Sequence, residues 1–364
     1  MKNGVNMSGM SEIRFEVMQN IEEGHVRFSA RANPEHGRSD VAIRTVRVGS
    51  QRAACDFSVS SAPYGSDLNQ YLPSPGELLL LSLGGCASIA AINGCTVKGI
   101  TVVNYSMELT ATIPEEAGQP LGDIRYVVTL ETPAEDGMIE RVSKNATCFS
   151  PNHRTFLEEN SAELKVHKGR PSGESRSRRT PREATGSGGG TSAGGEGRTV
   201  KVRLDWQIGT LFTVKIPLRG VEWTMELDQP KQMLGIDRAP NAQEYMLAGM
   251  SSEILLAAAR LEPDLAINAV DIGSSATMRG FMNTGQGAPV KMHDYVYDVY
   301  TDAEGDDVQA RLQKVMESCM TYQTVVNPQS VNVVFVHNGN TVSDHVSDMA
   351  TINEWLAGLQ RPMF

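Results

Sequence analysis

The stretch that decides the fold is Pro75-Gly-Glu-Leu-Leu-Leu-Leu-Ser-Leu-Gly-Gly-Cys86, and its apolar character continues to Ile92. Pro75 suits the first turn of a helix, and the carboxylate of Glu77 suits the positive end of the helix dipole. The segment is apolar nearly all round, which is typical of a helix buried at the centre of a fold. We therefore predict a central helix from Glu77 to about Val97, with the thiol of Cys86 buried inside it.

The second half of the chain repeats this pattern at a constant spacing. At an offset of 167 residues, the matched pairs are Arg52 and Arg219, Pro63 and Pro230, Pro73 and Pro240, Glu77 and Glu244, and Cys86 and Glu253. Cys148 matches Cys319 at an offset of 171, which implies a four-residue insertion between the two blocks. Repeats of this length indicate duplicated domains rather than a solenoid. The thiol of the first copy is replaced by a carboxylate in the second.

Composition places the chain among globular proteins with two domains. A length of 364 residues predicts about two domains, and an apolar fraction of 40% supports a core in each half. The net charge of −10 disfavours nucleic acid as a partner, because phosphate binding requires clustered lysine and arginine. The cysteines are odd in number and widely spaced, which does not suggest a secreted disulfide framework. They are Cys55, Cys86, Cys95, Cys148 and Cys319.

Neither the N-terminal segment nor the apolar helix suggests a membrane protein. The segment Met1–Gly9 has no apolar signal core. The uncharged run Leu78–Ile92 is shorter than the roughly 20 residues that a bilayer span needs. We therefore predict a cytoplasmic protein with no membrane partner.

The remaining patterns predict an α+β fold in both halves. In the first half we predict strands at 13–17, 25–32, 41–48, 55–59, 101–113, 122–132 and 162–167, and a second helix at 136–147. The second half repeats this order, with strands at 200–208, 211–217, 221–227, 265–278, 290–301 and 330–336, and helices at 241–261 and 306–319.

These elements define two domains and a linker. The domains cover residues 11–168 and 200–340. Residues 169–199 are rich in glycine, serine and arginine and can bury almost nothing, so we predict a disordered linker. The tail at 341–364 carries apolar residues at helical spacing between Ser343 and Leu359, which predicts a short amphipathic helix.

A second thiol lies in the segment Ala146-Thr-Cys148-Phe-Ser-Pro-Asn-His153. Together with Pro73–Cys86, this segment resembles the OsmC/Ohr family. In that family a reactive cysteine on a buried central helix and a partner cysteine on a later helix reduce organic hydroperoxides. The resemblance implies two tandem OsmC-like domains, the second divergent, each with a β-sheet wrapped around a buried central helix. It also implies an intramolecular pseudo-dimer in which the helices Glu77–Val97 and Gln243–Leu261 touch, and it leaves further association of chains open.

The resemblance assigns roles to several residues. Cys86 would attack the peroxide as a thiolate, and its sulfenic acid would condense with Cys148 to a disulfide that a dithiol reductant reopens. In the family an arginine held by a glutamate stabilises the thiolate; Glu77 matches that glutamate, Arg52 is the best candidate for the arginine and Arg44 is the runner-up. The implied role is a response to oxidative stress, with a small apolar organic substrate and no cofactor or metal.

Other interpretations stay open from the residues alone. Cys86 and Cys148 could be packed as small hydrophobic residues, as we expect for Cys55 and Cys95. Glu253 lies on an apolar helix, where it could pair with Arg260 or Arg219, have a raised pKa and act as a general acid or base, or be solvated. The alternatives are therefore a hydrolase, lyase or isomerase acting through Cys86 or Glu253, or a binding or redox-sensing protein. The pair of Cys148 and His153 is only a weak metal signal.

Overall fold

The structure is a computed structural model, and it describes all residues except 54–55, 173–197, 220, 283–287 and 359–364. The predicted disorder of the linker falls almost entirely on 173–197 and so lies outside the described residues. Cys55 and the side chain of Arg44 also lie outside them.

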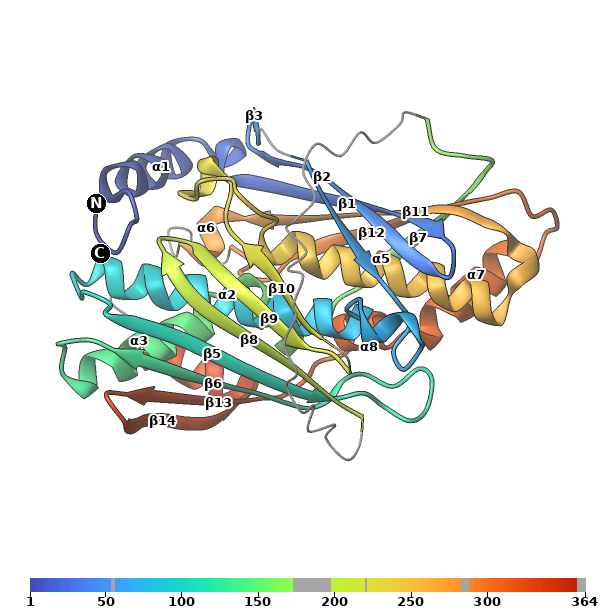
Figure 1. The fold of residues 1–364 in the computed structure, drawn as a ribbon. Coiled ribbons are helices and arrows are strands. Elements are labelled where there is room, and N and C mark those ends of the chain that lie inside the picture. Colours follow the sequence, from blue (N-terminus) through green and yellow to red (C-terminus); the bar gives the residue numbers. More distant parts are fainter. Residues whose placement is uncertain (54–55, 173–197, 220, 283–287, 359–364) are drawn as a thin grey trace.

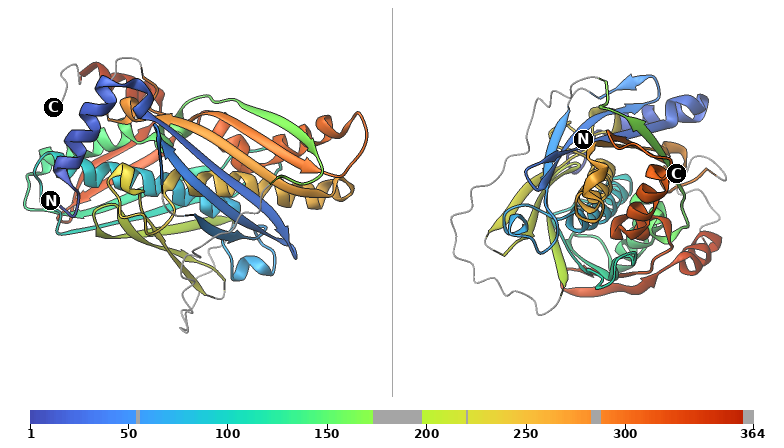
Figure 2. Two further views of the ribbon diagram at one scale, coloured as in Figure 1. Left: turned by 90° about the horizontal axis from the view of Figure 1, so that it is seen from above. Right: turned by 90° about the vertical axis from the view of Figure 1, so that its right-hand side faces the viewer.

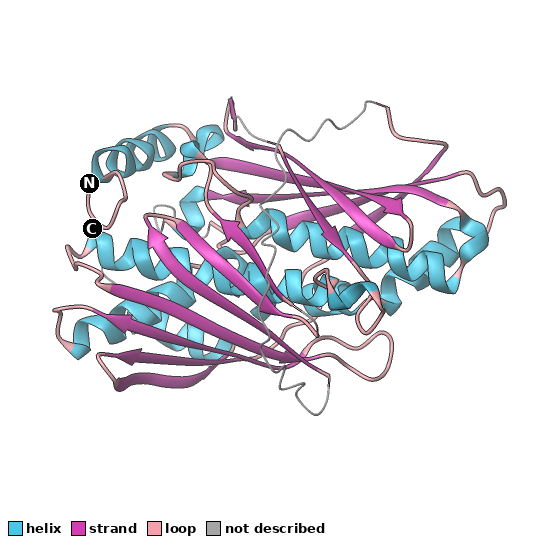
Figure 3. Ribbon diagram, in the orientation of Figure 1, coloured by secondary structure: helices cyan, strands magenta, loops and turns pink. Residues whose placement is uncertain are grey.

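Both halves of the chain contain helices and strands, and Figure 3 shows how the two kinds of element are arranged. The first half contains α1 (Met7–Gln19), β1 (His25–Glu35), β2 (Arg38–Val48), β3 (Gln51–Arg52), β4 (Phe57–Ser61), α2 (Pro75–Val97), β5 (Asn104–Thr112), β6 (Gly122–Glu131), α3 (Asp136–Phe149), α4 (Pro151–Leu157) and β7 (Ala162–Lys168). The second half contains β8 (Thr199–Ile208), β9 (Leu211–Pro217), β10 (Glu222–Leu227), α5 (Ala242–Leu261), β11 (Ile267–Thr277), α6 (Met278–Phe281), β12 (His293–Thr301), α7 (Val308–Ser318), α8 (Met320–Val326), β13 (Val331–His337), β14 (Asn340–Ser347) and α9 (Met349–Gly358). Short 3-10 turns lie at Ile21–Gly24, Leu68–Gln70, Lys231–Met233 and Pro263–Leu265.

The strands form two sheets, and each sheet takes strands from both halves (Figure 1). One has the order β3-β2-β1-β11-β12-β7, with β4 also paired to β2. The other has the order β10-β9-β8-β5-β6-β13-β14. In the first sheet β1 of the first half pairs with β11 of the second, and in the other β5 of the first half pairs with β8 of the second. The prediction of a separate sheet for each half is therefore wrong. The exchange of strands between the halves pairs the edge of β1 with β11 and the edge of β8 with β5. Without this pairing, the backbone N–H and C=O groups of these edges would be exposed or unsatisfied.

The two central helices α2 and α5 pack against each other between the sheets, as the repeat predicts (Figure 2). Each begins with a capping box, in which the N-cap residue and the glutamate three positions later hydrogen-bond each other's backbone N–H. These pairs are Ser74 with Glu77 and Asn241 with Glu244. The glutamates matched by the repeat thus have a structural role that accounts for their position.

One glycine allows the two central helices to approach closely. A Cβ atom at Gly249 would lie 2.8 Å from the carbonyl oxygen of Pro75, which belongs to the backbone of the other helix. We expect Gly249→Ala to lower the free energy of unfolding, because overpacking costs about 1–3 kcal/mol and alanine gains only about 1 kcal/mol over glycine in a helix. Urea denaturation measures the change. Gly137→Ala in α3 is the matched control, since no atom lies within 4 Å of its new Cβ; equal effects of the two variants would contradict this account.

The two ends of the chain differ from the prediction. Ile13–Val17 is not a strand but part of α1, whose N-cap Asn6 accepts a hydrogen bond from the backbone of Gly9. Its alternating apolar residues imitate a strand locally. At the other end, the predicted helix between Ser343 and Leu359 is divided between β14, which pairs with β13, and α9.

One helical stretch, Leu68–Val97, has the length and composition of a membrane span. In its most apolar window, 83% of the residues are buried inside the protein. Its apolar surface is therefore covered by protein, as expected for a core helix.

Candidate active site

A cavity of about 280 Å³ lies beside the central helices, and Cys86 forms part of its wall. Both halves of the chain and the N-terminal helix α1 contribute to this wall. The lining residues are Met7, Met10, Ser11, Ile13 and Arg14 of α1; Cys86, Ile89, Ala90, Asn93, Gly94, Val97 and Lys98 of α2 and its end; Asn145, Phe149 and Pro151; and Gln229, Met233, Leu234, Gln243, Met278 and Met282 of the second half. The thiol thus lies at an apolar cavity that neither half could form alone.

The sulfur of Cys86 accepts hydrogen bonds from two N–H donors. The backbone N–H of Asn152 lies 3.5 Å away in the first turn of α4, and the side-chain amide of Gln243 lies 3.3 Å away on α5. Burial nevertheless raises the pKa of Cys86 to about 11, although Ser150, Asn152 and Gln243 oppose the rise. Both amide donors favour the thiolate, but at neutral pH the thiol form predominates.

Cys148 is fully buried at the end of α3 and is not among the described residues that line the cavity. Burial raises the pKa of its thiol to about 12, and the nearby charge of Arg154 opposes the rise. Ser150 and Asn152, which interact with Cys86, follow Cys148 by two and four residues. Cys148 therefore lies in the same part of the fold as Cys86, and both thiols are free in this structure.

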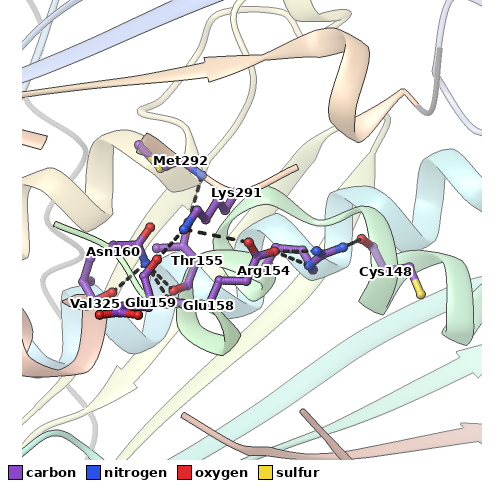
Figure 4. A network of polar contacts seen from close by, with 9 residues as sticks. All are labelled: Cys148, Arg154, Thr155, Glu158, Glu159, Asn160, Lys291, Met292 and Val325. Carbon is purple, nitrogen blue, oxygen red and sulfur yellow. Dashed lines mark hydrogen bonds and ion pairs between the residues drawn. The ribbon is translucent and has the colours of Figure 1, made fainter. Parts of the chain in front are cut away.

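An arginine held by a glutamate lies beside Cys148 (Figure 4). The guanidinium of Arg154 donates to the carbonyl of Cys148 at 3.2 Å and, through Nε, to Glu158 at 2.7 Å. Glu158 also faces the ammonium of Lys291 at 3.8 Å. The sequence interpretation missed this pair, although the four-residue spacing of Arg154 and Glu158 is the usual spacing of an ion pair on a helix.

The structure does not bring Glu77 and Arg52 to Cys86. Glu77 lies nine residues before Cys86 on the same helix, or about 13 Å along its axis at 1.5 Å per residue. Its carboxylate accepts the backbone N–H of Ser74 at 2.6 Å, and burial raises its pKa to about 7. The side chain of Arg52 is exposed on β3 and is not among the described residues that line the cavity.

Glu253 caps the short helix α8. Its two carboxylate oxygens accept the backbone N–H groups of Met320 at 3.1 Å and Thr321 at 2.6 Å. Burial raises its pKa, while these hydrogen bonds and the charge of Arg260 oppose the rise. The carboxylate thus occupies, at the start of α8, the position that the sulfur of Cys86 occupies at the start of α4.

This equivalence corrects the alignment of the later cysteines. Ser150 is the single residue between α3 and α4, and Cys319 is the single residue between α7 and α8. Cys319 therefore corresponds to Ser150 at an offset of 169 rather than to Cys148 at 171. The predicted pairing of Cys148 with Cys319 therefore does not match the structure, because Cys319 is the N-cap residue of α8 and Ser150 is the N-cap residue of α4.

The surroundings of Glu253 differ from those of Cys86. Gly76 replaces the amide donor Gln243 at the offset of 167, and a Cβ atom at Gly76 would lie 2.7 Å from the terminal methyl group of Met320. Met320 stands at the first position of α8, where α4 has Pro151. The surroundings of Glu253 thus have a carboxylate in place of the thiol, a glycine in place of the amide donor and Met320 in place of Pro151.

The surroundings of His153 indicate a structural role. It is fully buried, its Nε2 lies 2.9 Å from the hydroxyl of Ser347, and its Nδ1 lies 3.4 Å from the hydroxyl of Tyr126. Burial lowers its pKa to about 3. Among the described residues, no group of three or more histidine, cysteine, aspartate or glutamate side chains could hold a metal ion.

The fold and the site together define a mixed α+β protein with a buried thiol on its central helix. Residues 67–166 match the family model described as OsmC-like protein. The chain therefore carries an OsmC-like domain, and the matched region contains Glu77, Cys86 and Cys148. A comparison with curated proteins found no match.

Proposed function

We propose that this protein reduces organic hydroperoxides, with Cys86 as the attacking thiol. An OsmC-like domain suggests a stress-related thiol function at the level of the family. The observation that carries the proposal is the place of Cys86 at an apolar cavity, where its sulfur accepts two N–H hydrogen bonds. An apolar wall selects the organic part of a hydroperoxide, and the amide donors stabilise the thiolate that attacks it.

The reaction balances with a dithiol as the second substrate. The thiolate of Cys86 attacks the terminal oxygen of the hydroperoxide ROOH, the O–O bond breaks, and the alkoxide RO⁻ leaves and takes up the proton that the thiol released, which gives the alcohol ROH. The sulfenic acid on Cys86 then condenses with the thiol of Cys148, which forms a disulfide and releases water. A dithiol reductant restores both thiols by exchange. Arg154 would favour the thiolate of Cys148 for the second step.

We also propose that the chain is an internal pseudo-dimer of two OsmC-like domains, one of which has lost its thiol. The support is the exchange of strands between the halves, the contact of α2 with α5, and the equivalent positions of Cys86 and Glu253. The proposal makes Glu253 a helix cap rather than a general acid or base, because backbone N–H groups occupy both of its oxygens.

The test is an assay with cumene hydroperoxide and dithiothreitol. We expect the wild type to consume the peroxide continuously. In a single turnover without dithiothreitol, which would itself reduce the sulfenic acid, Cys148→Ser should consume about one equivalent of peroxide per chain, and a sulfenic-acid probe such as dimedone should then label Cys86. The wild type should instead form the disulfide and resist the probe. Cys95→Ser is the control, since Cys95 is buried on the same helix but lies outside the cavity lining. Failure of the wild type to consume peroxide would refute the proposal and favour a binding or redox-sensing role.

A further inference from the structure

The end of helix α3, where Cys148 lies, is capped by a side chain of α4. The guanidinium of Arg154 donates to the carbonyl of Cys148 at 3.2 Å. Carbonyls in the last turn of a helix have no partner within it and carry the negative end of its dipole. Only 10% of the Arg154 side chain is exposed, so water screens its charge weakly. Arg154 therefore satisfies the end of α3 and brings a positive charge to the second thiol, where it opposes the rise in the pKa of Cys148 that burial causes.

Two further charges extend from Arg154 to the second half of the chain (Figure 4). The carboxylate of Glu158 accepts the Nε–H of Arg154 at 2.7 Å. The ammonium of Lys291, which precedes β12, lies 3.8 Å from the other oxygen of this carboxylate and donates to the carbonyl of Glu159. The charges alternate in sign from Lys291 to Arg154, so Lys291 offsets the negative charge of Glu158. The group therefore keeps a positive charge beside Cys148.

The side of the protein that carries Glu253 repeats these hydrogen bonds without the charges. The N-cap residues of α4 and α8 are related by an offset of 169, and the same offset matches Cys148 with Glu317, Arg154 with Gln323 and Glu158 with Asn327. The side-chain amide of Gln323 donates to the carbonyl of Glu317 at 2.6 Å, and the amide of Asn327 donates to the side-chain oxygen of Gln323 at 2.6 Å. The contacts thus recur on both sides, with neutral amides in place of the ion pair.

This comparison separates the hydrogen bond from the charge. An amide is sufficient to satisfy the helix end at Glu317, so the cap by itself does not require a guanidinium. The end of α3 differs because it carries the thiol of Cys148, and the reactive form of a thiol is an anion. A cation held beside the thiol favours this anion, and a neutral amide does not. The positive charge of Arg154 therefore fits the chemistry of Cys148 rather than the capping of the helix.

We propose that a group of three charged residues positions Cys148 for its attack on the sulfenic acid of Cys86. The group consists of the positioning residues Arg154, Glu158 and Lys291. In this step the thiolate of Cys148 attacks the sulfur of Cys86, the S–S bond forms as the S–O bond breaks, and the leaving hydroxide takes up the proton that the thiol released. Arg154 stabilises the thiolate, and Lys291 brings the second half of the chain into this step. The attack rests on the hydroperoxide reduction proposed above, whereas the stabilisation of the Cys148 thiolate does not depend on it.

Alkylation of Cys148 by iodoacetamide tests this inference without any peroxide. The rate is measured in full-length Cys86→Ser by peptide mass spectrometry, with Cys95 of the same sample as the reference thiol. Arg154→Gln keeps a donor for the carbonyl of Cys148, as Gln323 does on the other side, and removes the charge. We expect it to slow alkylation of Cys148 about tenfold at pH 7, since a shift of one pKa unit changes the thiolate fraction tenfold, and to leave Cys95 unchanged. Arg154→Lys restores the charge and should recover most of the rate.

Two further variants locate the effect in this group. Lys291→Gln should slow the same alkylation about threefold, because partly exposed ion pairs contribute modestly. Arg141→Gln is the matched control, since Arg141 is exposed on α3, and it should leave the rate unchanged. A purely structural role of Arg154 predicts the opposite sign, because loosening the end of α3 would expose Cys148 and speed its alkylation. Equal or faster alkylation in Arg154→Gln would therefore overturn the proposal, as would an equal effect of Arg141→Gln.

The resolving step itself is measured by competition in the protein with both thiols. Cumene hydroperoxide is added without reductant at a fixed concentration of dimedone, and the ratio of dimedone adduct on Cys86 to disulfide reports the rate of resolution independently of the first step. Arg154→Gln should raise this ratio about tenfold, and Arg141→Gln should leave it unchanged. An unchanged ratio in Arg154→Gln would refute the role in resolution. If the wild type forms neither product, the peroxidase function fails, and the alkylation rates still decide whether the charged group supports Cys148.

Discussion

Replacing Cys86 with serine is expected to reduce hydroperoxide consumption to the rate seen without protein. A serine hydroxyl fits the same space but cannot form the sulfenic acid on which the reaction depends. The substitution keeps an acceptor for the N–H groups of Asn152 and Gln243, so the fold should be retained. The measurement is the initial rate with cumene hydroperoxide and dithiothreitol, together with thermal unfolding to show that the variant is folded.

The activity of Glu253→Gln should be compared with that of Cys86→Ser. The amide oxygen still accepts one of the N–H groups at the start of α8, and no thiol stands at the position of Glu253, so turnover should stay near the wild-type value. The opposite pattern, with full activity in Cys86→Ser and none in Glu253→Gln, would place the active site in the divergent half and refute the peroxidase assignment.

Oxidation of Cys86 is expected to become about tenfold faster for each pH unit between pH 7 and pH 10. Only the thiolate attacks the peroxide, and burial raises the pKa of this thiol to about 11. Below its pKa, the thiolate fraction therefore grows tenfold with each unit of pH. The change over the whole range is about a thousandfold, and single-turnover oxidation of Cys148→Ser by cumene hydroperoxide measures it without the disulfide step.

The variant Gln243→Leu tests whether the pKa of Cys86 determines this pH dependence. It removes one N–H donor from the sulfur, which should raise the pKa of Cys86 further and slow oxidation at every pH below the pKa. An oxidation rate that is already constant above pH 7 would contradict the expectation. It would mean that Cys86 is fully ionised at pH 7, although burial raises the pKa of its thiol.

Local patterns predicted most of the secondary structure and part of the site. Pro75 at the first turn, the carboxylate of Glu77 and the apolar run behind them predicted α2, and the matched Pro240 and Glu244 with their own apolar run predicted α5. Cys86 was identified as a buried thiol from the same run. These features depend on residues a few positions apart, which is why they can be read without the fold.

Other parts of the site depend on contacts between distant residues. The 167-residue repeat suggested Arg52 as the partner of the thiol, but β3 places it at an exposed edge, while Arg14, Lys98 and Gln243 reach the cavity from other elements. Arg14 was hidden in a segment whose alternating apolar residues imitate a strand. In the structure it is a helix that begins at the N-cap Asn6.

The sequence by itself determined that each half of the chain has a long apolar helix, and that the first carries Cys86 where the second has Glu253. Periodicity, capping and residue spacing are local properties, and they are sufficient for those conclusions. The tertiary structure alone decided that each sheet is shared between the halves, that Glu253 caps α8, and that α1 covers the cavity beside Cys86. The physical reason is that strand pairing and cavity formation satisfy backbone groups and bury surfaces from segments far apart in the chain, which no local pattern encodes.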